Sequence, residues 1–228
     1  MNKGINHPLN RHDFLISGFS TIGMALCYIS LFILFGAIIT FPAGEQIIAK
    51  IEYMQQELLL LSVAYGVGYL LFGCLLAFSV HVLDRHFSQH NYTWAKYGSL
   101  FGYVWVVLMM CAGMTSLLGM NMTVNLLATK PDTAVALFYA QNMVVNGLGG
   151  GIELVSGVWV LVISILGLKH KQFYTGLHVL GVVVGLVGIM TIWHTVGVLK
   201  DMFGLSQIVW FIWLGIALLK QRRILENE

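Results

Sequence analysis

The amino-acid sequence predicts an all-α protein: a polytopic membrane protein with six transmembrane helices and with both the N and C termini in the cytoplasm. Of its 228 residues, 58% are hydrophobic and only 10% are charged, whereas a soluble domain carries about 25% charged residues. The hydrophobic residues also form six long apolar runs separated by short polar segments. Because no long linker interrupts these runs, we expect one transmembrane domain over residues 1–228.

Each expected span is an apolar run bounded by polar or helix-breaking residues. Pro42 closes the first run, and Pro131 with Asp132 precedes the fourth. The amphipathic segment 43–56 is expected to lie at the membrane interface, and the polar segments 84–94 and 121–132 are expected to be loops. The six spans are predicted at about 14–41, 57–83, 95–120, 133–168, 172–198 and 203–219.

The distribution of Lys and Arg predicts the orientation. Nine of these residues lie in the two terminal segments and in the second and fourth connections between spans, and three lie in the other connections. Cytoplasmic loops carry the excess of positive charge, so both termini are expected inside. This short-loop charge orients a membrane protein and does not indicate nucleic-acid binding. The nine are Lys3, Arg11, Arg85, Lys96, Lys169, Lys171, Lys220, Arg222 and Arg223, against Lys50, Lys130 and Lys200.

The stretch from Gln141 to Trp159 carries the strongest chemical signal. Asn142, Asn146 and Glu153 follow one another at spacings of four and seven residues, which places them on one face of a helix. A carboxylate near the middle of a span costs at least ~2.5–3.5 kcal/mol, so it must face protein, water or a ligand. The fourth span, at about 133–168, is longer than a membrane requires. Either its first turns project outward or the glycines at 149–151 break the helix.

The leading hypothesis is that a small polar ligand or a cation binds inside the bundle, as in a transporter or sensor. No Lys or Arg lies mid-span to neutralise Glu153, which favours a protonated acid, a bound cation or a ligand amine. The alternative for Glu153 is structural: a hydrogen bond to another helix that fixes the bundle. The expected binding residues are Glu153, Asn146, Asn142, Tyr69 and Gln207, and further candidate partners are Tyr65, Thr115, Ser116 and His194.

Two other functional classes remain open. His81 and His178 are expected at similar depth on different spans, where they could ligate the iron of a b-type haem in a membrane redox protein. A metal site at His81, His86 and His90 is a weaker possibility, because a polar loop explains those residues. A structural or regulatory subunit is the third class. Its docking faces, or those of a homo-oligomer, would be the glycine-rich stripes of the second and fifth spans, such as Gly181 and Gly185.

Several negative observations narrow these hypotheses. No GxSxG, HExxH, Walker or dinucleotide-binding motif occurs, so no catalytic residue is predicted. The tryptophans of the later spans are expected to face lipid or the membrane interface rather than a cofactor. They are Trp159, Trp193, Trp210 and Trp213.

Two segments resemble a known family. They are GGGIELVSGVW, followed by a short basic turn, and FGLSQIVWFIWLGIALL near the end. Over about residues 141–219 the chain resembles a broad family of small six-span bacterial inner-membrane proteins, which is defined only as a domain of unknown function. The resemblance implies six helices and a multi-pass location in the bacterial cytoplasmic membrane. It implies no catalytic or binding residue.

Overall fold

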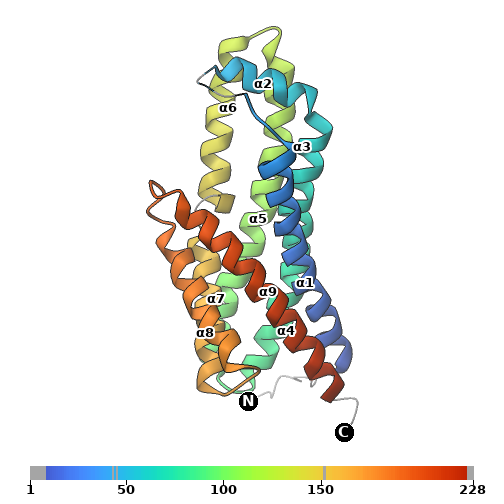
Figure 1. The fold of residues 1–228 in the computed structure, drawn as a ribbon, viewed down its shortest axis with the longest axis vertical. Coiled ribbons are helices and arrows are strands. Elements are labelled where there is room, and N and C mark those ends of the chain that lie inside the picture. Colours follow the sequence, from blue (N-terminus) through green and yellow to red (C-terminus); the bar gives the residue numbers. More distant parts are fainter. Residues whose placement is uncertain (1–8, 43, 45, 151–152, 225–228) are drawn as a thin grey trace, which may run out of the picture.

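The computed structural model describes residues 9–42, 44, 46–150 and 153–224, which form an elongated bundle of helices without a strand among them (Figure 1). Two of the helical segments, η1 and η2, are wound as π-helix, and a third irregular segment, η3, contains a kink at Gly149. In chain order the elements are α1 (Arg11–Ile33), η1 (Leu34–Ile38), α2 (Ile47–Gln56), α3 (Leu58–Tyr65), η2 (Gly66–Leu71), α4 (Phe72–Ser88), α5 (Tyr92–Leu127), α6 (Pro131–Val145), η3 (Asn146–Gly150), α7 (Leu154–Lys169), α8 (Thr175–Met190) and α9 (Val198–Ile224).

Five helical segments of the described chain are long and apolar enough to cross a membrane. The chain therefore has the helical architecture of a multi-pass membrane protein. The expected fifth span, 172–198, contains the apolar helix α8, whose 16 residues extend over only ~24 Å. The five segments are Arg11–Ile38, Leu58–Ser88, Tyr92–Leu127, Pro131–Lys169 and Val198–Arg222.

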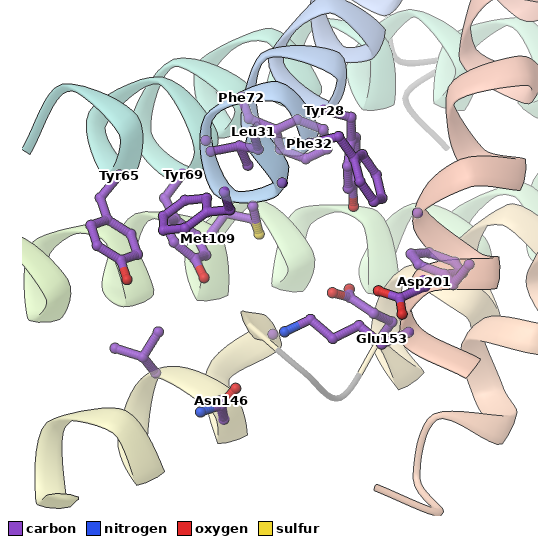
Figure 2. Close-up of a pocket in the computed structure, with 18 of the residues that line it drawn as sticks. Tyr28, Leu31, Phe32, Tyr65, Tyr69, Phe72, Met109, Asn146, Glu153 and Asp201 are labelled. Carbon is purple, nitrogen blue, oxygen red and sulfur yellow. The ribbon is translucent and has the colours of Figure 1, made fainter. Parts of the chain in front are cut away.

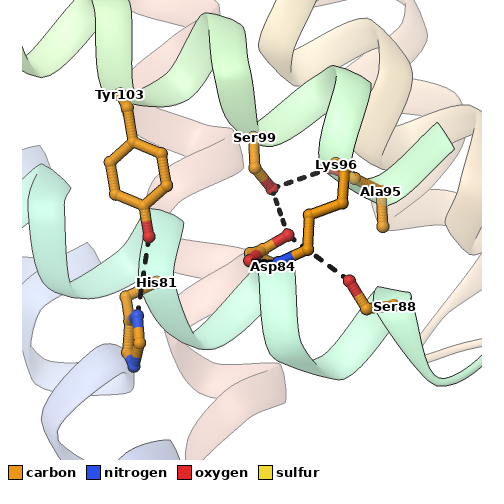
Figure 3. A network of polar contacts seen from close by, with 7 residues as sticks. All are labelled: His81, Asp84, Ser88, Ala95, Lys96, Ser99 and Tyr103. Atoms are coloured by element: carbon orange, nitrogen blue, oxygen red, sulfur yellow. Dashed lines mark hydrogen bonds and ion pairs between the residues drawn. The ribbon is translucent and has the colours of Figure 1, made fainter. Parts of the chain in front are cut away.

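The two expected polar loops are largely helical. α4 continues to Ser88, and α5 runs through residues 121–127 before it ends at Leu127. Asp84 is buried at the end of α4, where it pairs with Lys96 and accepts a 2.8 Å hydrogen bond from Ser99 Oγ, both on α5 (Figure 3). Because these contacts satisfy the carboxylate, a charged residue can lie inside a helix rather than in a loop. The amphipathic segment 43–56 contains the helix α2, and its location at the membrane interface stays a prediction.

Close glycine contacts bring helices together within the chain. A Cβ atom on Gly185 of α8 would lie 2.8 Å from the carbonyl oxygen of Gly157 on α7, and one on Gly181 would lie 2.0 Å from Ser164 Oγ. Gly181 and Gly185 thus meet another helix of the same chain, a contact that small residues at this spacing favour. Because α7 already covers these glycines, they do not supply the free docking face that the structural-subunit hypothesis requires; a homo-oligomer through other surfaces stays a prediction.

The described chain contains two hydrophobic cores. The larger one includes Trp105, Trp159 and Trp210, whose rings contact one another in series at centroid distances of 5.8 and 5.9 Å. The expectation that Trp159 and Trp210 face lipid is therefore wrong; both are fully buried, whereas Trp193 is exposed. The smaller core packs α2 against the region where α3, α5 and α6 meet.

The fourth predicted span does not continue as one helix. α6 ends at Val145, and Gly149 has φ 121° and ψ 11°, values that a helix does not contain. Only glycine adopts such a conformation without strain, because any Cβ would clash with the backbone. The prediction that Asn142 and Glu153 share one face of a continuous helix is therefore wrong. Gly151 lies outside the described residues.

Candidate functional site

A cavity of about 520 Å³ lies where residues of both hydrophobic cores meet (Figure 2). Its wall draws residues from α1, η1, α3, η2, α4, α5, α6, η3 and α9, together with Glu153 before α7. Among them are Leu31 and Tyr65, which pack on the smaller core, and Phe72 and Phe203, which belong to the larger one. The volume is typical of a small-molecule site.

The irregular helical segments of the described chain all contribute to this wall. η1 supplies Phe35 and Gly36, η2 supplies Gly68 and Tyr69, and η3 supplies Asn146. π-Helical turns are rare and occur often at functional sites, because they leave the regular i→i−4 hydrogen-bond pattern. The convergence of two π-helical segments and the kinked segment η3 on one cavity distinguishes this region from the rest of the bundle.

Glu153 is fixed at the base of the cavity by its backbone. Its amide nitrogen donates a 2.7 Å hydrogen bond to Thr191 Oγ1, beyond the end of α8, and its carbonyl oxygen accepts from Gly157 at 2.8 Å as α7 begins. The Ser156 hydroxyl lies 3.1 Å from Glu153 Oε2. No described residue donates to Oε1, although the residue is only 8% exposed. One carboxylate oxygen is therefore held by Ser156, and the other has no protein donor within the described part of the chain.

The two asparagines reach the same cavity from the other side of the break. The Nδ2 atoms of Asn142 and Asn146 donate to the carbonyl oxygens of Phe138 and Asn142, at 2.9 and 2.7 Å. These bonds orient each amide, because only its nitrogen can donate to a carbonyl. Neither Oδ1 atom has a hydrogen-bond partner among the described residues, so both remain available as acceptors.

Three tyrosines and two charged residues, Lys200 and Asp201, complete the polar surface of the cavity. In Figure 2 the phenol groups of Tyr28, Tyr65 and Tyr69 point toward the side where Glu153 and Asn146 lie, and none of the three hydroxyls forms a hydrogen bond with a described residue. Lys200 and Asp201, at the start of α9, also line the cavity. Lys200 forms no ion pair with Glu153, so the cavity holds both charges without joining them.

Four of the five predicted binding residues therefore line one cavity: Glu153, Asn142, Asn146 and Tyr69. Gln207 does not line it. Its side chain is fully buried, and neither amide atom has a partner among the described residues. Ser116 bonds to the carbonyl of its own helix at Ala112, and His194 is exposed.

Sequence reasoning missed Tyr28, Lys200 and Asp201. Tyr28 places a phenol hydroxyl within the apolar run of the first span. A polar group in such a run could have marked it as a candidate site residue. Lys200 was expected on the outer surface, because a linear span model places it beyond the end of the fifth helix. In the structure α8 ends early at Met190 and α9 begins at Val198, which brings Lys200 to the cavity.

The two histidines of the haem hypothesis lie in different surroundings. His81 is exposed, with Nδ1 3.5 Å from the Tyr103 hydroxyl (Figure 3). His178 is buried, with Nε2 2.9 Å from the carbonyl oxygen of Gln172. The two histidines contact no residue in common within the described part of the chain, so the haem hypothesis gains no support and stays a prediction.

A different set of histidines gathers around the connection between α7 and α8. His86 lies 3.1 Å from Gln172 Oε1 and stacks on Phe173, while His90 lies beside His170, with ring centroids 5.6 Å apart. Within the described part of the chain, no group of three or more His, Cys, Asp or Glu side chains has the arrangement of a metal site. The hypothesis of a metal at His81, His86 and His90 therefore gains no support from the described residues.

The comparisons with known proteins add no assignment. No protein-family model, curated protein or solved structure matches this chain.

Proposed function

We propose that this chain is a multi-pass membrane protein that binds a small polar ligand or a cation at Glu153, in the cavity where the two cores meet, as a transporter or sensor does. The observation that carries the proposal is the placement of Glu153. A carboxyl group that is 8% exposed keeps one oxygen without a protein donor and lines a cavity of about 520 Å³.

A purely structural role for Glu153 accounts less well for these contacts. Structural carboxyl groups in membranes hydrogen-bond to another helix. Here the contact with a neighbouring element, to Thr191, uses the backbone nitrogen, and the side chain bonds only to Ser156 in its own turn. A leucine could keep the backbone contact, so the carboxyl group itself requires another explanation, which a ligand provides.

We further propose six passes, with both termini in the cytoplasm of a bacterial cell and the bundle in the inner membrane. The start of α1 and the end of α9 lie at the same end of the bundle (Figure 1), as an even number of passes requires. α8 supplies the additional pass in this proposal, despite its short length, since a thinner bilayer or the flanking residues can accommodate a short helix. The sequence resemblance supports six helices and the bacterial inner membrane, and the Lys and Arg distribution supports the orientation.

The test is ligand-dependent stability of the purified protein in detergent. The probes are sodium, potassium and magnesium chloride, glycine betaine, and small organic amines, alcohols and carboxylates. A ligand that binds only the folded state raises stability by about 2.7 kcal/mol at one hundred times its dissociation constant. We expect at least one probe class to raise the melting temperature, and we expect Glu153→Gln to remove that increase.

The matched control is Glu52→Gln, which removes the same charge from an exposed position on α2 outside this cavity. It should respond to the probe as the parent does. If no probe changes the melting temperature, or if Glu153→Gln responds like the parent, the proposed binding function is wrong.

A further inference from the structure

The free polar groups of the cavity are mainly hydrogen-bond acceptors. Glu153 Oε1 and the Oδ1 atoms of Asn142 and Asn146 have no donor among the described residues. Carboxylate oxygens and amide oxygens accept but cannot donate. The phenols of the three tyrosines can do either. A ligand that satisfies this surface must therefore bring several N–H or O–H donors, and a carboxylate ligand would leave these acceptors unpaired.

The opposite wall is aromatic. Tyr65 and Tyr69 are stacked with ring centroids 5.8 Å apart and an interplanar angle of 15°, and Phe35 lies against Tyr65 at 5.8 Å. Tyr28 meets Phe72 edge to face at 5.3 Å. All five rings line the cavity. Aromatic faces attract cations and pack against apolar groups, so this wall suits a cation that carries hydrocarbon.

The size of the cavity indicates more than a bare ion. Its volume of about 520 Å³ compares with about 30 Å³ for one water molecule in the liquid. An inorganic cation at Glu153 would leave the aromatic wall without a partner. The lining also holds two carboxylates, Glu153 and Asp201, against the single ammonium of Lys200, so its charge balance favours a cation when both acids are ionised.

We propose that the ligand class of this site is a protonated organic amine with an apolar or aromatic body. The inference rests on the proposed function, because it assigns the ligand of the same cavity. The ammonium group donates a hydrogen bond to Glu153 Oε1, and the side-chain oxygens of Asn142 and Asn146 line the same cavity as further acceptors. The body packs on the aromatic wall around Tyr69.

Lys200 gives the proposal a second consequence. Its ammonium lines the same cavity without an ion pair to Glu153, so it repels a bound cation and attracts a bound anion. Replacement by methionine removes the charge and keeps most of the apolar stem. Lys200→Met should therefore strengthen binding of an organic amine and weaken binding of a carboxylate.

The experiment measures dissociation constants for three probes that share one aromatic body: 2-phenylethylammonium, neutral 2-phenylethanol and anionic 3-phenylpropionate. Sodium chloride is the fourth probe, with ionic strength held constant. We expect the ammonium compound to bind at least about tenfold more tightly than the other two organic probes, which corresponds to one charge-assisted hydrogen bond. Glu153→Gln should remove that preference, and Glu52→Gln should keep it.

The aromatic wall is tested at Tyr69. Tyr69→Phe keeps the ring and should bind the ammonium probe nearly as the parent does, whereas Tyr69→Leu should weaken binding by between about twofold and thirtyfold. Tyr139→Leu, at an exposed position on α6 outside the cavity, is the control and should leave binding unchanged.

The outcomes separate this inference from the proposed function. If sodium or 3-phenylpropionate binds in a Glu153-dependent manner and the ammonium probe does not, the ligand class is wrong while binding at Glu153 stands. Equal affinity for the amine and the alcohol, or weaker amine binding by Lys200→Met, also overturns the ligand class. If none of the four probes binds, the amine assignment is wrong, and the broader probe set decides the proposed function.

Discussion

Gly157 of α7 and Gly185 of α8 lie in direct backbone contact: a Cβ atom placed on Gly185 would be 2.8 Å from the carbonyl oxygen of Gly157. The same Cβ would lie 2.7 Å from Leu161 Cβ. Neither neighbour is the flexible end of a side chain, so α7 and α8 would have to separate to admit it. This contact positions the end of α8, and with it Thr191, against Glu153.

The first prediction is that Gly185→Ala lowers the free energy of unfolding by roughly 1–3 kcal/mol, a cost typical of overpacking. Gly66→Ala is the control, because a Cβ there would meet nothing within 4 Å, and it should be neutral or slightly stabilising since alanine favours helix. Thermal unfolding in detergent measures both. Equal stability of Gly185→Ala and the parent would contradict the helix contact described above.

The second prediction concerns the backbone break beside the site. Gly149 has φ 121°, and a Cβ there would meet open space, so Gly149→Ala tests backbone strain without a steric clash. We expect a loss of about 1–2 kcal/mol in unfolding free energy, or a shift of the break with weaker amine binding. Gly147→Ala, also in open space but without a positive φ, should change neither quantity. If both variants behave like the parent, the conformation of Gly149 does not constrain the site.

The third prediction concerns the pair that joins α4 to α5. The Asp84 side chain is only 7% exposed. Lys96→Met removes its ammonium partner and leaves hydroxyl donors such as Ser99, which already bonds to the carboxylate in the parent. We expect the free energy of unfolding to fall by roughly 1–3 kcal/mol, because a buried carboxylate loses its charged hydrogen-bond partner. Lys130→Met is the control, since Lys130 is exposed and forms no ion pair in the described chain.

The double variant Asp84→Asn with Lys96→Met should recover part of that loss, because no isolated charge remains. A double variant that is as unstable as the sum of the two single variants would show that Asp84 and Lys96 act independently.

The fourth prediction concerns topology. A reporter fused after the C terminus should lie in the cytoplasm, and one inserted into the turn at residues 128–130, between α5 and α6, should lie on the opposite side. Enzymatic reporters that are active on only one side of the membrane measure this directly. The reverse result at both positions would refute the proposed orientation, and the same side for both would refute the number of passes between them.

From the sequence alone one could predict helices long and apolar enough to cross a membrane, and could single out Glu153 as the most informative residue. Both conclusions follow from local quantities: the hydropathy of a run, and the cost of a carboxylate within it. A close contact between Gly185 and another helix could also be predicted, because small residues at a helical spacing indicate helix packing.

Which side chains share a cavity, and which tryptophans are buried, could be learned only from the way the helices pack. Trp159 and Trp210 lie in the core while Trp193 is exposed, and hydropathy cannot separate them because lipid and protein interior are equally apolar. Tyr28, Tyr69, Glu153 and Lys200 meet in one cavity although they lie far apart in the chain. Their meeting depends on how the separate helices pack, and on the break at Gly149 that turns the chain between Asn146 and Glu153. A glycine permits such a turn, but the packing around it selects the turn over a continuous helix.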